Sequence, residues 1–300
     1  MITDTQREAR NKGIGSSDVP ALFGLDPWKT QRDVWLVKTG AIPGTAAGEA
    51  ARIGSALEPV ILSLASEELG RKIVAPTSTF VRGVLRANVD GMIDEFKRGQ
   101  PIVEAKMVSV DDDWGDSGTD QVPDRVRLQV THQMLAAGSR ECWIARLLCK
   151  FGVKFSMYHV LLDDDLAASV EQRCEEWWQR HIVAGEEPSG AVSPDVAKSV
   201  IRTPGKTIVV PEMLARRERE AKQALENAEA AYEEAKYAVI GEFGDAEIGE
   251  CPAMGVRYKF SSVTSRRVDT KALEAAHPDI VAAFRQESTT RRWSAGKMKA

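Results

Sequence analysis

The chain has 300 residues, of which 43% are apolar and 28% charged, and its formal net charge is −4. This composition excludes a fibrous or wholly disordered chain, and the length suggests one large domain or two small ones. A charge so close to neutral argues against a protein that coats nucleic acid non-specifically, but it leaves room for local phosphate contacts.

Membrane association and disulfides are not expected. No apolar run approaches the roughly 20 residues that cross a bilayer, and the N-terminal MITDTQREARNKG is polar. The four cysteines, Cys142, Cys149, Cys174 and Cys251, lack the paired spacing of disulfide frameworks or zinc sites. We therefore expect a cytoplasmic protein with reduced thiols.

The first 190 residues show alternating helix and strand patterns. Ser16, Ser17 and Asp18 precede a short apolar stretch that Gly24 ends, which is typical of a helix start. Further helices are expected over 30–39, 50–69, 125–137 and 165–183, and strands over 79–86, 91–95, 101–108, 142–149 and 154–162. This order predicts an α/β (α+β) domain in which a mixed central sheet is flanked by helices.

The rest of the chain is expected to form an accessory part. Residues 185–207 contain three glycines and three prolines, which indicates a linker, placed at 191–207. A long helix over 211–241 carries an alanine-rich heptad stripe, typical of a close but weak helix–helix contact. A strand pair over 246–263 and a short helix complete the module. The expected domains are thus 1–190 and 208–300, joined by the linker.

The strongest chemical pattern combines Asp90-Gly91 with Glu104-Ala105-Lys106. Strand alternation places Glu104 and Lys106 on one face with Ala105 opposite, and an Asp on a neighbouring strand can meet them. Two converging carboxylates favour Mg²⁺ or Mn²⁺, and a nearby lysine can orient or help deprotonate a water. These groups are the minimum for metal-assisted phosphodiester hydrolysis.

Spacing alone leaves a second interpretation open for this motif. The chain holds five acidic-x-Lys triplets: Glu95–Lys97, Glu104–Lys106, Glu220–Lys222, Glu234–Lys236 and Asp269–Lys271. Only Glu104–Lys106 lies in an apolar strand downstream of Asp-Gly. A sheet-edge ion pair without catalytic function has the same local pattern.

Six short segments in a fixed order add to this motif. They are IGSSDVPALFGLDPWKT, LVKTG, GSALEPVI, NVDGMID, VEAKMV and RLQVTHQML. Over residues 7–183 the series resembles the YqaJ-type viral recombinase family, whose relatives are the phage lambda exonuclease and the PD-(D/E)XK nuclease superfamily. The resemblance implies a restriction-endonuclease-like core. It also implies a Mg²⁺-dependent exonuclease that resects double-stranded DNA from 5′ ends and leaves 3′ single strands for phage recombination by strand annealing.

The resemblance further implies roles for the residues of the core motif. Asp90, Glu104 and Lys106 correspond to the catalytic residues of such nucleases. Glu58 would add a carboxylate to the metal site, and Ala105 a backbone carbonyl. Without the resemblance, Glu58 would be interpreted as an ordinary glutamate on a helix surface.

Two other segments gain roles in the same way. Gln129 would position Lys106 or the attacking water, and Gln133, one turn later, lies on the same helix face. Arg10 and Ser17 match positions that hold a 5′-phosphate in lambda-type enzymes, with Ser16 competing for that role. On local pattern alone, Ser17 is equally suited to be a helix N-cap.

The implied partners are double-stranded DNA ends, a phage single-strand annealing protein and further copies of the chain, a trimer by analogy, in the cytoplasm of the bacterial host. The dispersed cysteines indicate that no iron–sulfur cluster is bound. The alternatives are a RecB-like or Cas4-like repair nuclease, an endonuclease on the same fold, or a non-catalytic module that binds DNA ends or a partner. Trp28 is expected to pack in the core, with DNA stacking as the alternative. The acidic residues 110–120 are expected to form a mobile loop.

Overall fold

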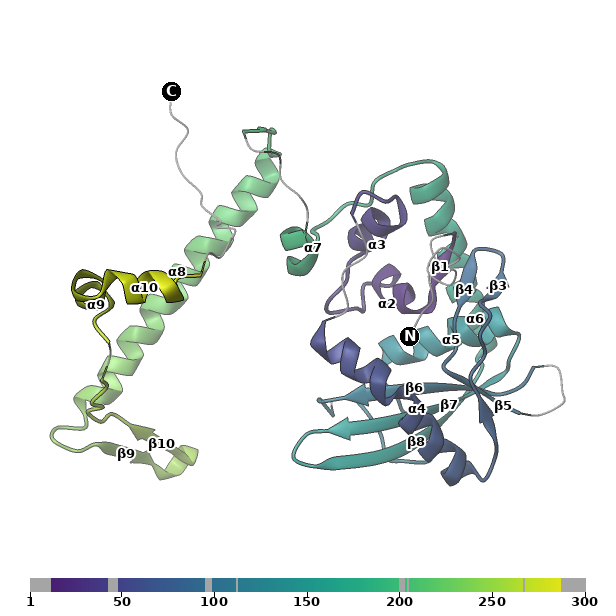
Figure 1. The fold of residues 1–300 in the computed structure, drawn as a ribbon, viewed down its shortest axis with the longest axis horizontal. Helices are drawn as coiled ribbons and strands as arrows, with labels where there is room; N and C mark the ends of the chain where they lie inside the picture. Colours follow the sequence, from purple (N-terminus) through teal and green to yellow (C-terminus); the bar gives the residue numbers. More distant parts are fainter. Residues whose placement is uncertain are drawn as a thin grey trace. The chain divides into compact units, whose positions relative to one another are not determined.

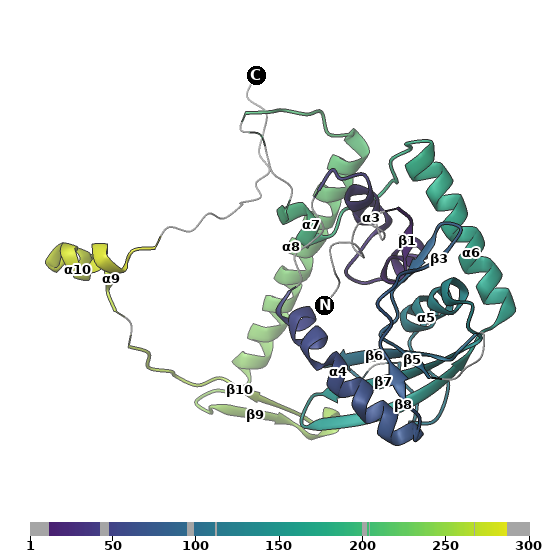
Figure 2. The same cartoon turned by 45° about the vertical axis from the view of Figure 1, so that its right-hand side comes forward.

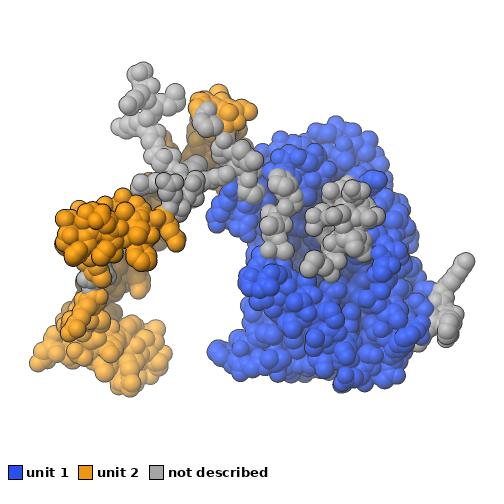
Figure 3. Space-filling view, viewed as in Figure 1, with its two compact units in different colours: residues 1–201 blue, residues 202–300 orange. Residues whose placement is uncertain are grey.

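The computed structural model describes residues 12–42, 48–94, 99–111, 113–199, 203, 205–266 and 268–286. The chain divides into two compact units, residues 1–201 and 202–300 (Figure 3). Within the described residues, no helix combines the length and apolar character needed to span a membrane.

A five-stranded mixed sheet forms the centre of the first unit (Figure 1). Its spatial order is β2 (Ile73–Val74), β5 (Gly91–Ile93), β6 (Ile102–Val108), β7 (Glu141–Cys149) and β8 (Val153–Leu161). β6 and β7 run parallel, and the other neighbours run antiparallel. The parallel pair needs a crossover, which a helix supplies, whereas β7 and β8 form a hairpin. The predicted mixed α/β class is confirmed.

Helices surround this sheet. They are the 3₁₀ turn η1 (Ser16–Asp18), α2 (Val19–Leu22), α3 (Gln31–Lys38), α4 (Glu49–Leu69), α5 (Asp124–Ala137), α6 (Asp164–Trp178) with its π-helical continuation η2 (Gln179–Val183), and α7 (Pro194–Ser199). α7 lies in the range expected to be a linker. Ser193 and Val196 are buried there, so packing of the first unit continues beyond residue 190.

The two faces of the sheet are covered by α4 and α5 (Figure 2). Ile102 of β6 packs in a cluster with Met134 of α5, whereas the next residue, Val103, packs in a cluster with Ile61 of α4. The alternation of side chains along β6 therefore buries both faces. It also directs Glu104 toward the α5 side.

A smaller sheet carries the start of the described chain. Its order is β1 (Ile14–Gly15), β4 (Leu85–Ala87) and β3 (Phe80–Arg82), with β1 parallel to β4. The range 79–86, expected as one strand, is a hairpin, because Gly83 adopts φ +52° and the chain reverses there. β1 was not predicted, since two residues are too few to show alternation. Its pairing places η1 beside β4 and α5.

The second unit is built on one long helix. Its elements are α8 (Glu212–Gly241), β9 (Ile248–Cys251), η3 (Pro252–Met254), β10 (Val256–Lys259), α9 (Thr270–Ala276) and α10 (Pro278–Phe284). β9 and β10 form an antiparallel pair. The predicted long helix is present, and none of its residues, all of which are described, is buried.

Candidate active site

The candidate catalytic residues lie where β6 extends beyond its short neighbour. β5 pairs with β6 only through Gly91↔Val103 and Met92↔Ile102. Asp90 immediately precedes β5, and its Oδ2 accepts a hydrogen bond of 2.8 Å from the backbone N–H of Ala105. The strand register therefore brings Asp90 beside the Glu104-Ala105-Lys106 segment.

Glu104 is the centre of a hydrogen-bond network. The residue is only 3% exposed, and both its carboxylate oxygens have donors. Nε2 of Gln129 donates to Oε1 and Nε2 of Gln133 donates to Oε2, each at 2.6 Å. Nζ of Lys106 lies 2.5 Å from Oε1 of Glu104 and donates to Oε1 of Gln129 at 2.9 Å. Positions four apart on a helix share a face, so α5 can present both glutamines to one carboxylate.

Burial and like charge determine the protonation of this group. Desolvation, and then the proximity of Glu104, raise the pKa of Asp90 well above its usual value. Burial by itself would lower the pKa of Lys106, but the charge of Glu104, its hydrogen bond and Asp90 together raise that pKa. Lys106 is therefore a cation at neutral pH. Desolvation also raises the pKa of Glu58.

A cleft of about 1330 Å³ connects the residues singled out from the sequence. Those that line it are Ser16, Ser17, Glu58, Asp90, Glu104, Ala105, Lys106, Gln129 and Gln133. A smaller pocket of about 270 Å³ is also bordered by Ser17, Lys106 and Gln129. Arg10, the other candidate phosphate ligand, lies outside the described residues.

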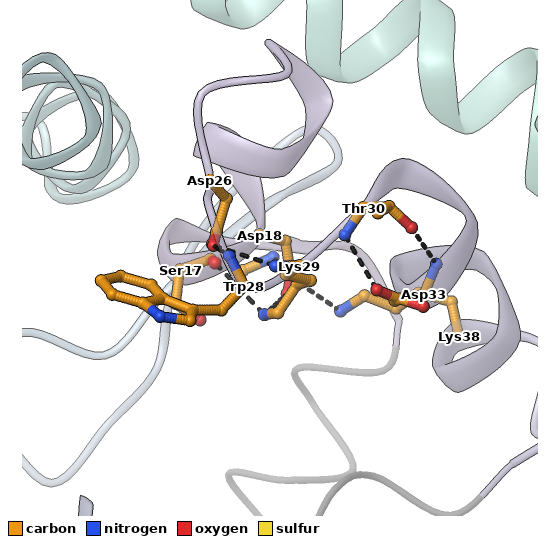
Figure 4. Close-up of polar contacts among 9 residues, drawn as sticks. Ser17, Asp18, Asp26, Trp28, Lys29, Thr30, Asp33 and Lys38 are labelled. Atoms are coloured by element: carbon orange, nitrogen blue, oxygen red, sulfur yellow. Dashed lines mark hydrogen bonds and ion pairs between the residues drawn. The ribbon is translucent and has the colours of Figure 1, made fainter. Parts of the chain in front are cut away.

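A partly buried charge cluster holds the Ser17 segment (Figure 4). Asp18 is 7% exposed and forms ion pairs of 3.0 Å with both Lys29 and Lys38. Asp18 also accepts a hydrogen bond from the backbone N–H of Gly15 at 3.1 Å. Nζ of Lys29 donates to the carbonyl oxygen of Ser17 at 3.3 Å. These contacts fix the backbone of Ser17 where it borders the cleft.

Trp28 differs from the core packing expected of it. It is 71% exposed and borders both cavities. The guanidinium of Arg125 lies 5.6 Å from the centroid of its ring. The sequence signal was ambiguous, because a tryptophan among polar neighbours is compatible with burial and with exposure.

Two described glycines of the acidic segment 110–120 form backbone contacts with β8. Tyr158 Oη donates to the Gly115 carbonyl at 3.1 Å, and the Gly118 N–H donates to the Met157 carbonyl at 2.7 Å. Asp113 from this segment lines the cleft. These contacts join Gly115 and Gly118 to β8, whereas a mobile loop was expected.

The donor set of the cleft suits a hard divalent cation. Asp90, Glu104, Glu58 and the Ala105 carbonyl offer oxygen ligands, which Mg²⁺ and Mn²⁺ prefer. Burial raises the pKa of the neighbouring Cys142 well above its usual value, so its thiol stays protonated and is a poor ligand. As placed, the described residues contain no group of three or more His, Cys, Asp or Glu side chains that could hold a metal ion. The oxygen ligands are therefore of the type that such an ion prefers. Glu58 does not form one three-carboxylate group with Asp90 and Glu104 in the described residues.

Known proteins resemble this chain in sequence and in structure. The uncharacterized protein YqaJ of Bacillus subtilis (strain 168) is 29% identical over 310 residues, which cover 98% of this chain and 94% of that protein. A solved alkaline exonuclease, LHK-Exo from Laribacter hongkongensis, has a TM-score of 0.45 at 14% identity, over 61% of this chain and 94% of that one. A phage related exonuclease from Haemophilus somnus 129PT has a TM-score of 0.44 at 12% identity, over 58% and 96% of the two chains.

The family comparison agrees with the ordered motifs. The matched range begins before the Ser17 segment and ends after α5, so it includes the described residues of the hydrogen-bond network. The resemblance predicted from the sequence is confirmed: residues 7–140 match the YqaJ-like viral recombinase domain.

Proposed function

We propose that this protein is a metal-dependent deoxyribonuclease that degrades double-stranded DNA from 5′ ends and leaves 3′ single-stranded tails for recombination. The observation that carries the proposal is the linked arrangement of Asp90, Glu104, Lys106 and Gln129 in one cleft. Acidic oxygen ligands beside a protonated lysine are suited to hydrolysis of a phosphodiester. The match to a viral recombinase domain supports DNA as the substrate.

The metal would be held by Asp90, Glu104 and the Ala105 carbonyl, with Glu58 approaching from α4. When bound, Mg²⁺ or Mn²⁺ supplies Lewis-acid charge at the scissile phosphate. The raised pKa of Asp90 is consistent with this assignment, because it comes first from burial and then from the nearby charge of Glu104, and a bound cation would offset both effects.

Lys106 and Gln129 would handle the attacking water. The Lys106 side chain is 24% exposed and lines the cleft while its ammonium group contacts Glu104. Gln129 holds Lys106 through its amide oxygen and Glu104 through its amide nitrogen. The glutamine therefore fixes the distance between the cation and the carboxylate, which orients both toward one reacting atom.

The 5′ direction would come from a terminal-phosphate site. Ser17 borders the cleft beside Lys106, with Ser16 next to it, and Arg10 is assigned to the same site by resemblance. A hydroxyl and a guanidinium together give a charge-assisted phosphate contact. DNA with 5′-hydroxyl ends should be cut more slowly than DNA with 5′-phosphate ends, and equal rates would remove this role.

The proposal extends to partners. The 3′ tails would pass to a phage single-strand annealing protein in the host cytoplasm, and the nuclease would assemble as a homo-oligomer, a trimer by analogy. The unburied α8 of the second unit supports a role in such contacts. Truncation at residue 207 should weaken assembly or partner capture and leave digestion intact.

The first test is digestion of linear duplex DNA labelled separately at its 5′ and 3′ ends, with Mg²⁺ or with EDTA. We expect Mg²⁺-dependent loss of the 5′ label by the wild type and not by Lys106→Ala. Lys72→Ala is the matched control, because Lys72 forms an exposed ion pair with Asp94 in the same unit. Bound but undigested DNA would instead indicate a binding module, and cleavage of circular DNA an endonuclease.

A further inference from the structure

We propose that Trp28 and Arg125 form a stacking subsite for a single unpaired nucleobase, next to the phosphate that is cut. The inference rests on the proposed function and adds a base-binding contact to it. Five lines of structure carry it: the exposure of the ring, the rigidity of its support, its cation partner, the lining of the pocket and the size of the pocket.

The exposure of Trp28 is unusual for its surroundings. A tryptophan that is 71% exposed leaves a large apolar plane in contact with water, although the same cleft holds charged groups. Such a plane suits a ligand that is itself flat and apolar on its faces and polar at its edge. Nucleobases have this character, and each base stacked on an aromatic side chain contributes to binding irrespective of sequence.

The backbone that carries Trp28 is held firmly. Oδ1 of Asp26 accepts hydrogen bonds from the N–H of Trp28 at 2.8 Å and from that of Lys29 at 3.0 Å. The side chain of Lys29 is in turn paired with Asp18 at 3.0 Å (Figure 4). The chain is therefore fixed on both sides of Trp28, so the ring is presented in a defined place.

Arg125 completes an electropositive platform. Its guanidinium lies 5.6 Å from the ring centroid of Trp28, a distance typical of a cation–π contact. Arg125 begins the cleft-facing side of α5, the helix that also carries Gln129 one turn later. A cation at this position can contact the phosphate that follows a stacked base.

The pocket beside the ring is of base size and adjoins the reacting groups. Its volume is about 270 Å³, below the range of about 300–1,000 Å³ for drug-sized ligands. Trp28 and Arg125 share it with Lys106 and Gln129, and its apolar part is formed by Pro20, Met107, Val108 and Val126. One base fits this space.

The geometry assigns the pocket to one base, stacked on the exposed face of Trp28, and a base that turns onto this face leaves its pair. Because Lys106 borders the pocket, that base adjoins the scissile phosphate. Unpairing a terminal base costs free energy, and stacking on Trp28 would offset part of it. A protein partner is less suited to the pocket, since the Arg125 guanidinium at its border favours a polyanion.

Binding in EDTA tests the subsite without catalysis. We would titrate a short single-stranded oligodeoxynucleotide into the wild type and into Trp28→Leu, Trp28→Tyr and the control Tyr232→Leu. Leucine keeps apolar bulk but cannot stack as a ring, so Trp28→Leu should weaken binding by about 5- to 150-fold. Trp28→Tyr and Tyr232→Leu should bind within a few-fold of the wild type. Tyr232 is 67% exposed and lies in the other unit.

Abasic substitution identifies the base. A single abasic nucleotide at each of the first three 5′ positions should, at one position, weaken wild-type binding by the same factor as Trp28→Leu. At that position Trp28→Leu should cause no further loss, because the stacking partner is already absent. The subsite would be overturned if the abasic and Trp28→Leu effects on binding added fully at every position. It would also be overturned if Trp28→Leu bound the oligonucleotide as tightly as the wild type.

Turnover separates this inference from the proposed function. On duplex DNA with Mg²⁺, Trp28→Leu should raise KM and leave kcat within a few-fold, and its thermal unfolding should match the wild type. Normal digestion by Trp28→Leu with unchanged KM would refute the subsite alone. Absence of digestion by the wild type, with Trp28-dependent oligonucleotide binding retained, would refute the nuclease and leave the base-binding site.

Discussion

Gln129 and Gln133 offer a matched test of how the network works. Both donate to Glu104 at 2.6 Å, and both lie on the same face of α5. Only Gln129 also contacts Lys106, at 2.9 Å. Replacing each by leucine keeps approximate size and removes the hydrogen bonds, so the pair of variants separates support of the carboxylate from alignment of the lysine.

The expected magnitudes follow from what each variant loses. A hydrogen bond to a charged group contributes about 1.5–3 kcal/mol. If alignment of Lys106 is lost in the transition state, Gln129→Leu should lower kcat by about 10- to 150-fold. Gln133→Leu leaves the Lys106 contact in place, and its effect on kcat should be smaller, within about 10-fold.

Stability should show the opposite order. Gln133 is 1% exposed, so Gln133→Leu removes the donor to Oε2 of Glu104 at a place that water does not readily reach. The expected loss of unfolding free energy is about 1.5–3 kcal/mol for Gln133→Leu. The half-buried Gln129 borders the cleft, and water can take over its bonds, so the loss should be about 1 kcal/mol or less.

The assay is digestion of labelled duplex DNA under saturating Mg²⁺ together with urea unfolding of the same preparations. Lys72→Ala serves as the control for both measurements. Equal losses of kcat in the two glutamine variants would refute the reasoning, because the Lys106 contact would then have no separate effect. A larger stability loss for Gln129→Leu would refute the assignment of burial.

Three further predictions concern the supports of the site and its metal. Gly13→Ala should lower the unfolding free energy by about 1–3 kcal/mol in urea unfolding. The new Cβ would lie 2.2 Å from the Val84 carbonyl oxygen, which accepts the hydrogen bond from Ile14 that joins β1 to β4. Unchanged stability would contradict this. Asp33→Ala should lower the unfolding free energy by about 2–4 kcal/mol in the same assay. The Asp33 carboxylate accepts hydrogen bonds from the N–H groups of Thr30 and Ser193, and the residue is 2% exposed. Asp33→Asn should retain part of this stability. Mg²⁺ at 100 times its Kd should stabilise the wild type by about 2.7 kcal/mol in thermal unfolding, and an equal shift in Asp90→Asn would argue against Asp90 as a ligand.

Local patterns predicted the centre of the site well, because strand alternation and helix spacing act over a few residues. Alternation placed Glu104 and Lys106 on one face, and the four-residue spacing of Gln129 and Gln133 placed both on one side of α5. His132, between these two glutamines on α5, is fully buried, with Nε2 3.0 Å from the Ile14 carbonyl oxygen.

Features that depend on distant contacts could not be predicted in the same way. The N–H of Ser193 bonds to Asp33 across 160 residues, and no local pattern signals that a Pro- and Gly-rich segment packs there. Trp28 was expected in the core, since its sequence neighbours do not show whether it is buried. Its exposure depends instead on tertiary contacts such as the one with Arg125 of α5. Positions set by tertiary packing override local propensity in both cases.

The arrangement around Glu104 shows how the same contacts support folding and chemistry. A buried carboxylate is costly unless hydrogen bonds and a cation compensate it, and here two glutamines and Lys106 do so. Asp90 is buried close to Glu104, and these two effects raise its pKa well above the usual value, although its hydrogen bond from the Ala105 N–H acts in the opposite direction. Asp90 and Glu104 both line the cleft. A divalent cation at this place would stabilise the folded chain as well as prepare it to cut, so metal affinity and stability should change together in Asp90 variants.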